Sequence, residues 1–200
     1  MPKTKAQFEE IKNQRKQDIL NHALYLFAIK GYAAVTMDEI ANECKCSHGL
    51  VFHYFSNKEN LFHELMETLV DVKFKDIVSK INTNQPTKFI FIDSIEAALN
   101  ALKDDDDRYA CTIYLLLNLY LQRSVLPKPR NDKYRKAPVM STLSLLEKGV
   151  KEGVFYENNP KELLIAVIST LKGLAYNRIN IGNKFTCPKS EIITRMVIKQ

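Results

Sequence analysis

Apolar residues recur at helical spacing along almost the whole chain, and this pattern restricts the possible folds more than any other feature. Near the N-terminus, Leu20, Ala23, Leu24 and Phe27 follow the i, i+3, i+4, i+7 spacing of one helix face. No alternating run of apolar and polar residues is long enough for a sheet. Six glycines and seven prolines are also too few for a loop-rich all-β chain. The sequence therefore predicts an all-α fold of about nine helices.

Capping residues and prolines indicate where several helices begin. Thr36–Glu39 and Ser56–Glu59 have the capping-box pattern, in which two side chains accept hydrogen bonds from amides at a helix start. Asn159-Pro160 places an N-cap residue before a proline at the first helical position, so a helix is expected from there to about Gly182. Pro127, Pro129 and Pro138 bracket a basic connection. The helix after this connection is expected from about Val139 to Gly153, and a last one from Pro188.

The composition excludes several classes of protein. Apolar residues make up 46% of the chain and charged residues 26%, which is typical of a globular protein with a real core. No apolar run approaches the ~20 residues of a membrane-spanning helix, and the polar N-terminus lacks the apolar segment of a signal peptide. We therefore expect a cytoplasmic protein without a membrane partner.

Sequence patterns of enzymes and metal sites are also missing. The chain has no Ser, His and Asp in a catalytic order, no glycine-rich phosphate loop and no paired carboxylate motif. The four cysteines, at positions 44, 46, 111 and 187, lack the paired spacing of a zinc site. They are interpreted as buried or turn thiols, with a redox sensor as the alternative. The sequence predicts no enzyme, no metal and no cofactor.

The pattern that points to a function lies in residues 19–65. Two short capped helices, joined by a tight turn at about Cys44–Ser47, have the layout of a helix-turn-helix, whose second helix enters the major groove of DNA. Helical spacing alone fits a plain helical hairpin equally well. The net charge of +6 does not decide between them, because the first 80 residues carry equal numbers of acidic and basic side chains.

Particular residues at fixed spacing favour the helix-turn-helix. The region resembles the N-terminal signature of the TetR family of transcriptional regulators in Ile19-Leu20, Ala23, Leu26-Phe27-Ala28, Gly31-Tyr32, Thr36, Ile40-Ala41, Ser47, Gly49, Phe52, Tyr54-Phe55, Lys58-Glu59 and Leu61. Further along, Gly149, Gly153 and Phe155 resemble the G-x-x-x-G-x-F stretch that ends the seventh helix of this family.

The resemblance implies both an organisation and a function. Residues 10–72 would form a three-helix DNA-binding domain, with a fourth helix continuing to about residue 81 as a connector. Residues 82–200 would form a helical regulatory and dimerisation domain. The implied function is that of a ligand-responsive repressor, which binds palindromic double-stranded DNA as a homodimer and is released by a small molecule. The alternative is a helical ligand-binding or scaffold protein with weakened or lost operator binding.

Two residues depart from the family pattern and motivate that alternative. The glycine usual in the turn is Lys45 here, which would cost on the order of 1 kcal/mol if φ is positive, although it also adds a cation beside the DNA. The usual tyrosine before the last turn of the second helix is Phe52, so a hydroxyl directed at a phosphate is lost.

Carried over position by position, the resemblance implies a set of DNA contacts. Contacts that hold the DNA backbone are expected from Thr36, Lys45, Tyr54 and Lys58. Residues expected to face the major groove are His48, Gly49, Leu50 and His53. The alternatives are core packing for Leu50, a solvated surface position for His53, and for Lys58 a role confined to its own helix terminus.

The resemblance also implies a ligand pocket among the C-terminal helices. The candidate lining residues are Phe91, Tyr109, Tyr114, Asn118, Met140 and Asn177, and plain core packing is their alternative. The Asp104–Asp107 run is interpreted as a capping and solvated turn rather than a metal site. The basic connection, residues 123–136, is interpreted as a solvated loop, or else as a gate for an anionic or acyl-carrying ligand.

The two C-terminal helices are the expected dimer interface. Their apolar stripes are too extensive for both to face water, and a twofold pairing would bury each against its copy. The stripes consist of Leu164, Val167, Ile168, Leu171 and Ala175 on one helix and Ile192, Ile193 and Met196 on the other.

Overall fold

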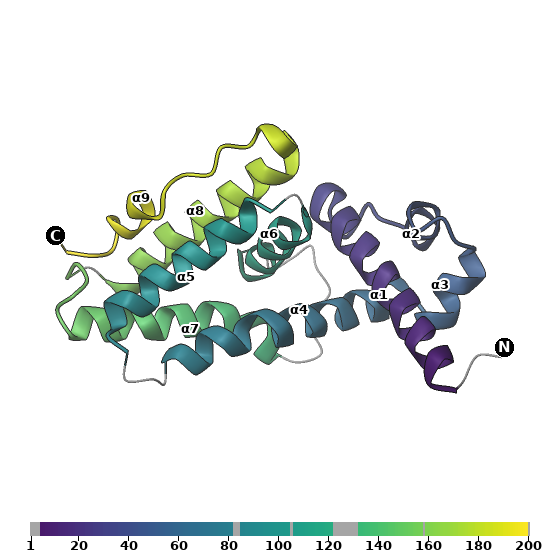
Figure 1. Ribbon diagram of the computed structural model, residues 1–200, viewed down its shortest axis with the longest axis horizontal. Helices are drawn as coiled ribbons and strands as arrows, with labels where there is room; N and C mark the ends of the chain where they lie inside the picture. The colour runs from purple at the N-terminus through teal and green to yellow at the C-terminus, as the bar shows by residue number, and fades with distance from the viewer. Residues whose placement is uncertain (1–4, 82–84, 105, 122–131, 158, 200) are drawn as a thin grey trace.

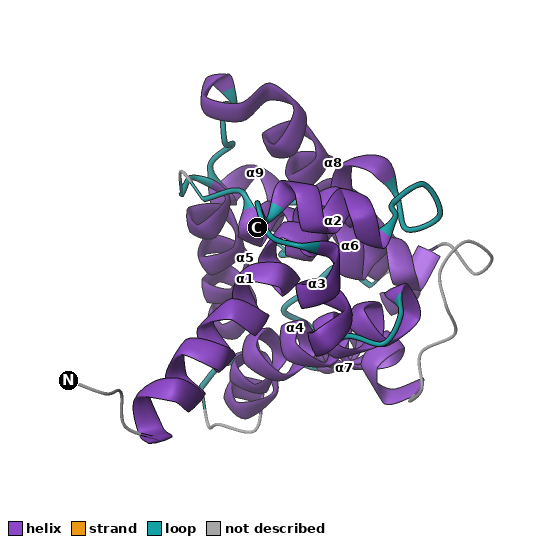
Figure 2. Ribbon diagram, turned by 90° about the vertical axis from the view of Figure 1, so that its right-hand side faces the viewer, coloured by secondary structure: helices purple, strands orange, loops and turns teal. Residues whose placement is uncertain are grey.

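Helices make up the fold, as the sequence predicted. The computed structural model describes residues 5–81, 85–104, 106–121, 132–157 and 159–199, with the backbone alone at 70–81, 119–121 and 132–138. Within these residues Figure 2 shows helices and loops without a strand, and the only extended pairing is one isolated bridge between Phe155 and Ile198. None of the described helices is long and apolar enough to cross a membrane.

Nine α-helices and one short 3-10 helix follow one another through the described residues (Figure 1). They are α1 (Lys5–Lys30), α2 (Met37–Glu43), α3 (His48–Tyr54), α4 (Lys58–Ile81), α5 (Thr87–Leu102), α6 (Arg108–Leu121), α7 (Asp132–Lys151), α8 (Pro160–Ile181), η1 (Gly182–Lys184) and α9 (Ser190–Thr194).

Buried apolar side chains form two clusters. The first contains residues from helices α1, α2, α3 and α4, together with Cys111, Leu115 and Leu116 of α6. The second joins α5 to α9. Helix α6 contributes to both clusters because it packs against α1 on one side and against α8 on the other. The helices of the predicted DNA-binding region are therefore held in part by a helix of the C-terminal region.

The start predicted for helix α7 is wrong. Proline was expected to keep the chain out of a helix until about Val139, but α7 begins at Asp132 and Pro138 lies inside it. A proline within a helix removes one backbone hydrogen bond and bends the axis, a cost that packing of the following turns offsets. Here Val139, Leu143 and Leu146 of α7 are buried in the second cluster. The rest of the basic connection, residues 123–131, lies outside the described residues.

The last predicted helix is also shorter than expected, because α9 ends at Thr194. Beyond it the backbone pairs with the segment that follows α7: the Tyr156 amide donates to the Val197 carbonyl (2.9 Å) and the Lys199 amide to the Val154 carbonyl (3.2 Å). Val197 and Ile198 are buried in the second cluster. The amides of residues 195–198 still donate to carbonyls three or four residues back, so long-range pairing replaces local hydrogen bonds only at the Val197 carbonyl and the Lys199 amide.

Candidate nucleic-acid interface

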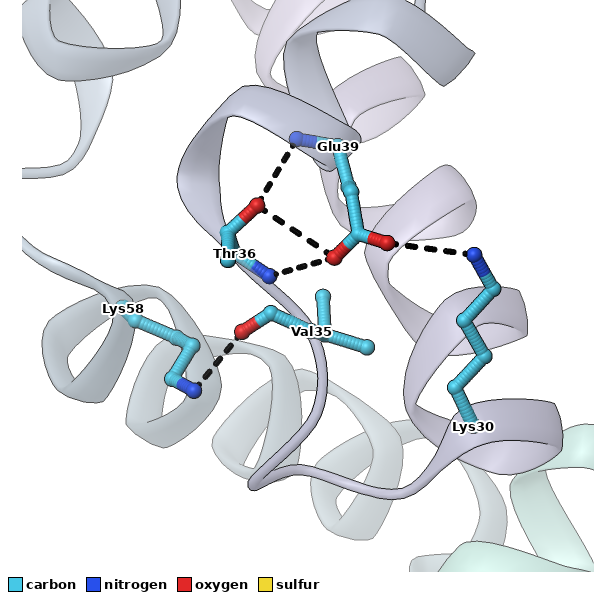
Figure 3. Close-up of polar contacts among 5 residues, drawn as sticks. All are labelled: Lys30, Val35, Thr36, Glu39 and Lys58. Atoms are coloured by element: carbon cyan, nitrogen blue, oxygen red, sulfur yellow. Dashed lines mark hydrogen bonds and ion pairs between the residues drawn. The ribbon is translucent and has the colours of Figure 1, made fainter.

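A capping network at the start of α2 holds Thr36 in place (Figure 3). The Glu39 amide donates to Thr36 Oγ1 (3.1 Å), and the Thr36 amide donates to Glu39 Oε2 (2.8 Å), which confirms the predicted capping box. Lys30, in the last turn of α1, donates to the other oxygen of Glu39 at 3.2 Å. The Thr36 amide, and after it Lys30, lowers the pKa of the Glu39 carboxyl, because both stabilise its charged form. Thr36 remains exposed beside this network.

The turn between α2 and α3 has the backbone that a glycine would favour. Lys45 has a φ of 51°, the one positive φ of a non-glycine residue in the described part of the chain. The strain expected at Lys45 depended on a positive φ, and this φ is present. The Lys45 side chain is exposed. Amide hydrogen bonds close the turn on either side of it: Lys45 N–H donates to Asn42 and Cys46 N–H to Ala41, both at 3.0 Å.

The cysteines beside Lys45 behave as turn thiols. Cys44 and Cys46 are half-buried and pack against the first cluster. Burial, and then the neighbouring Cys46 thiol, raises the pKa of Cys44 to about 12. A thiol with so high a pKa holds its proton and is a poor nucleophile, which supports the turn-thiol interpretation over the redox sensor.

Helix α3 turns one face to the core and the opposite face to solvent. Ser47 caps the helix by accepting from the Leu50 amide (3.2 Å), and Val51 is fully buried in the first cluster. On the other face His48, Gly49 and His53 are exposed, and Leu50 is half-buried. A methyl group at Gly49 would meet no protein atom within 4 Å, so the glycine is not required by the packing of the protein itself.

His48 has two neighbours that orient its ring. Its Nδ1 contacts Asp38 Oδ1 of α2, and the Phe52 ring lies against it with centroids 4.4 Å apart. A carboxylate at Nδ1 favours the tautomer with its proton on that nitrogen, which leaves Nε2 as the atom free for another partner. Asp38 is not recognisable as a partner of His48 from the sequence, because a carboxylate ten residues before a histidine has no characteristic spacing.

Two residues that were expected to contact the DNA backbone, Tyr54 and Lys58, make contacts within the protein. Tyr54 is half-buried against the first cluster. Lys58 donates from Nζ to the carbonyl oxygens of Val35 (2.7 Å), Tyr32 (2.8 Å) and Ala33 (3.3 Å), and Nζ lies 4.4 Å from the centre of the Tyr32 ring. The structure thus places Lys58 behind the loop before α2, although the sequence predicted that it faces a phosphate.

The six residues expected to line a ligand pocket are not gathered around one cavity. Met140 and Asn177 are on the surface and Phe91 is buried against Phe155, which corrects their assignment to a common lining. Tyr114 is half-buried beside Tyr176. Tyr109 lines a cleft of about 420 Å³ between α1, α4 and the α5–α6 corner. Asn118 is buried, and its Oδ1 has no hydrogen-bond partner among the described residues.

The apolar stripe predicted for dimerisation is mostly part of the monomer core. The members buried in the second cluster are Leu164, Val167, Ile168, Ala175 and Ile193. Leu171 is partly buried against the same cluster. Ile192 and Met196 are exposed in the monomer. Helix α8 also carries apolar residues on its opposite face, which was not predicted, with Ile165 47% and Tyr176 50% exposed.

Asp106 caps α6, as predicted for the Asp104–Asp107 run, while Asp104 and Asp107 bind a buried arginine. Asp106 Oδ1 accepts from the Arg108 amide at 2.9 Å. Arg178 of α8 is buried, with Nη1 2.7 Å from the Asp107 carboxylate and Nη2 donating to the Asp104 carbonyl at 2.9 Å. Its Nε donates to the Leu102 carbonyl at 3.2 Å. This ion pair joins α8 to the corner between α5 and α6.

The sequence of this chain is similar to those of known proteins. A family model described as "Bacterial regulatory proteins, tetR family" matches residues 19–65. The chain is 26% identical to the transcriptional repressor KstR2 of Rhodococcus jostii, over 88% of this chain and 84% of that protein. It is 29% identical to the transcriptional regulator YerO of Bacillus subtilis over 60% of this chain, but the match spans only 40% of YerO.

Solved structures have the same fold at low sequence identity. The fatty acid degradation regulator FadR from Bacillus halodurans superposes with a TM-score of 0.64 at 19% identity, over 91% of this chain and 92% of that one. AibR, solved with isovaleryl coenzyme A and operator DNA, also has a TM-score of 0.64, at 16% identity over 90% of this chain and 94% of that one. Residues 19–65 therefore form the helix-turn-helix domain of the tetR family of bacterial regulatory proteins, and the relatives named above are transcriptional regulators rather than enzymes.

Proposed function

We propose that this protein is a transcriptional repressor that binds a palindromic operator as a homodimer and is released by a small molecule. The observation that carries the proposal is the exposed face of α3. Its first turn presents His48 and Gly49, and Val51 fixes the opposite face in the core. The N-terminal residues of such a helix are the ones that reach base edges in the major groove.

The proposed DNA contacts divide into two groups. Thr36, Lys45 and Tyr54 would hold phosphates, and His48, Gly49, Leu50 and His53 would face the bases. Lys45 is exposed at the turn that precedes α3, where a cation can approach the DNA backbone. Phe52 and Lys45 depart from the family pattern, but α3 still has this exposed face. We therefore favour a protein that binds an operator over one that has lost operator binding.

The proposed dimer uses the outer face of α8. Ile165 and Tyr176 are exposed there, and Ser169 and Gly173, also exposed, lie between them on the helix. Small residues between larger apolar ones let two helices approach closely. A monomer would leave this face in water, whereas twofold pairing would bury it once on each subunit.

The effector is proposed to bind among α5 to α8. The unpartnered Oδ1 of Asn118 supports this location, since a buried polar atom without a hydrogen bond is costly and a ligand can supply the missing donor. AibR was solved in complex with isovaleryl coenzyme A, and FadR is a fatty acid degradation regulator. Acylated molecules are therefore the first class of effector to test.

Selection of DNA from a random pool tests the proposed function. We expect the wild-type protein to enrich a palindrome with half-sites one helical turn or more apart, because two related helices must enter successive major grooves. His53→Ala is expected to change the enriched base at one position of each half-site while binding to random DNA stays the same. Failure of the wild-type protein to enrich any sequence would contradict operator binding. Equal loss on specific and random DNA for His53→Ala would remove His53 from base readout.

Replacing Lys45 by glycine separates strain from charge. Because φ is 51°, we expect Lys45→Gly to raise the free energy of unfolding by about 1 kcal/mol. The same change removes one cation per subunit beside the DNA, so the slope of log K against log salt should flatten by roughly 2 units for the dimer. Thermal unfolding and a salt titration of operator binding measure the two effects. An unchanged slope would show that Lys45 faces solvent in the complex.

A further inference from the structure

We propose that Lys58 is a positioning residue for DNA binding, which ties the loop carrying Thr36 to the first turn of α4 without contacting a phosphate. The inference rests on the proposed function, because it concerns how the protein holds a DNA-contacting residue. It replaces the expectation from the sequence, which placed the Lys58 ammonium on the DNA backbone.

The hydrogen bonds of Lys58 leave it no donor for a phosphate. An ammonium group has three N–H donors. Nζ of Lys58 has carbonyl partners at 2.7, 2.8 and 3.3 Å, all within residues 32–35 (Figure 3 draws the bond to Val35). The Tyr32 ring covers another side of the same nitrogen at 4.4 Å. To reach a phosphate, the side chain would first have to break these contacts.

The position of Lys58 in its helix also points to the loop. Lys58 is the first residue of α4, where the helix dipole disfavours a cation. Burial acts in the same direction, and it lowers the pKa of the Lys58 ammonium. Three carbonyl oxygens and an aromatic face offset part of these two costs. They come from residues 23 to 26 positions earlier in the chain, so the cation serves a tertiary contact.

The loop that Lys58 holds leads directly into the DNA-binding elements. Val35 is fully buried in the first cluster, and its carbonyl is one of the three that Lys58 binds. The next residue is Thr36, whose amide and hydroxyl make the capping box of α2. Release of the Val35 carbonyl would therefore free the loop beside the Thr36 hydroxyl and the first turn of α2.

Lysine is better suited to this site than arginine, and this gives a test. A compact ammonium can donate to three convergent carbonyls, whereas the planar guanidinium of arginine suits a carboxylate or phosphate. If Lys58 contacted a phosphate, Lys58→Arg would keep the affinity for operator DNA. A carbonyl site predicts that Lys58→Arg and Lys58→Met both weaken binding, each by about tenfold, a loss typical of one charge-assisted hydrogen bond.

The experiment is a salt titration of operator binding by the full-length variants. We expect the slope of log K against log salt to match wild type for Lys58→Met, because no phosphate contact is lost. Lys45→Met, which removes an exposed cation from the turn, should flatten the slope by roughly 2 units and so shows the assay's sensitivity. Lys88→Met, an exposed change on α5, controls for general loss of charge. A flattened slope for Lys58→Met, or unchanged affinity for Lys58→Arg, would overturn the proposal.

Two further measurements separate positioning from loss of folding. Amide hydrogen exchange is expected to speed up in residues 32–36 of Lys58→Met and to stay the same in α5 and α8. In a background of Thr36→Val, the effect of Lys58→Met on affinity should fall from tenfold to less than twofold, because Lys58 acts through Thr36. A tenfold effect in both backgrounds would contradict the proposal. Absence of DNA binding by the wild-type protein would instead contradict the proposed function.

Discussion

Ile165→Asp is expected to convert the dimer to monomers at micromolar concentration and to weaken operator binding more than a hundredfold. Ile165 is exposed on the outer face of α8, so a charge there costs the monomer little. In a twofold interface the substitution removes two apolar side chains from contact and buries two like charges, at a cost of several kcal/mol. Operator binding falls because separate monomers lose the effective concentration that links two half-sites.

Sedimentation equilibrium measures the dimerisation constant, and a gel shift with the selected operator measures binding. Phe89→Asp is the matched control, because Phe89 is an equally exposed apolar residue at the start of α5. Leu171 is less suitable, since it packs partly against the second cluster and a charge there would also damage the monomer. A wild-type protein that is monomeric at micromolar concentration would contradict the dimer, and a dimeric Ile165→Asp would contradict this face.

Gly149→Ala is expected to lower the free energy of unfolding by about 2 kcal/mol. A Cβ at Gly149 would overlap the ring of Phe155, with Cγ at 2.8 Å and two other ring atoms closer. Phe155 cannot easily move away, because it is fully buried, stacks edge-on with Phe91 and pairs through its backbone with Ile198. Overpacking of this kind costs about 3 kcal/mol, and alanine's greater helix propensity returns about 1.

Urea denaturation of the single and double variants tests the cause. If the overlap with the ring is responsible, Gly149→Ala combined with Phe155→Leu should cost at least 1 kcal/mol less than the sum of the separate effects, since the smaller side chain leaves room for the methyl group. Additive effects would show that the glycine is needed for another reason. A stability equal to wild type for Gly149→Ala would mean that the ring moves aside at no cost.

The sequence alone determined most of the helices, the N-terminal caps of α2 and α3, and the helix-turn-helix. These features depend on interactions between residues a few positions apart, such as the Thr36–Glu39 box and the Ser47 cap, so the local sequence contains all their partners. The strained turn at Lys45 was predictable from the family pattern, because a glycine is usual at this position. Recognition of residues 19–65 then indicated DNA binding.

Tertiary structure decided which face of each helix is free. Helix α8 has apolar residues on two faces, and helical spacing cannot tell which face packs inside the monomer; the choice of Leu164 and Val167 for the core left Ile165 and Tyr176 outside. Likewise α9 ends at Thr194 in a turn, and the backbone after this turn pairs with residues 154–156, which are far away in the sequence. The role of Lys58 depends on carbonyl groups more than twenty residues away, which carry no side-chain signal. Which carbonyl groups a side chain binds, and which of two apolar faces is buried, is decided only when distant parts of the chain come together in the folded protein.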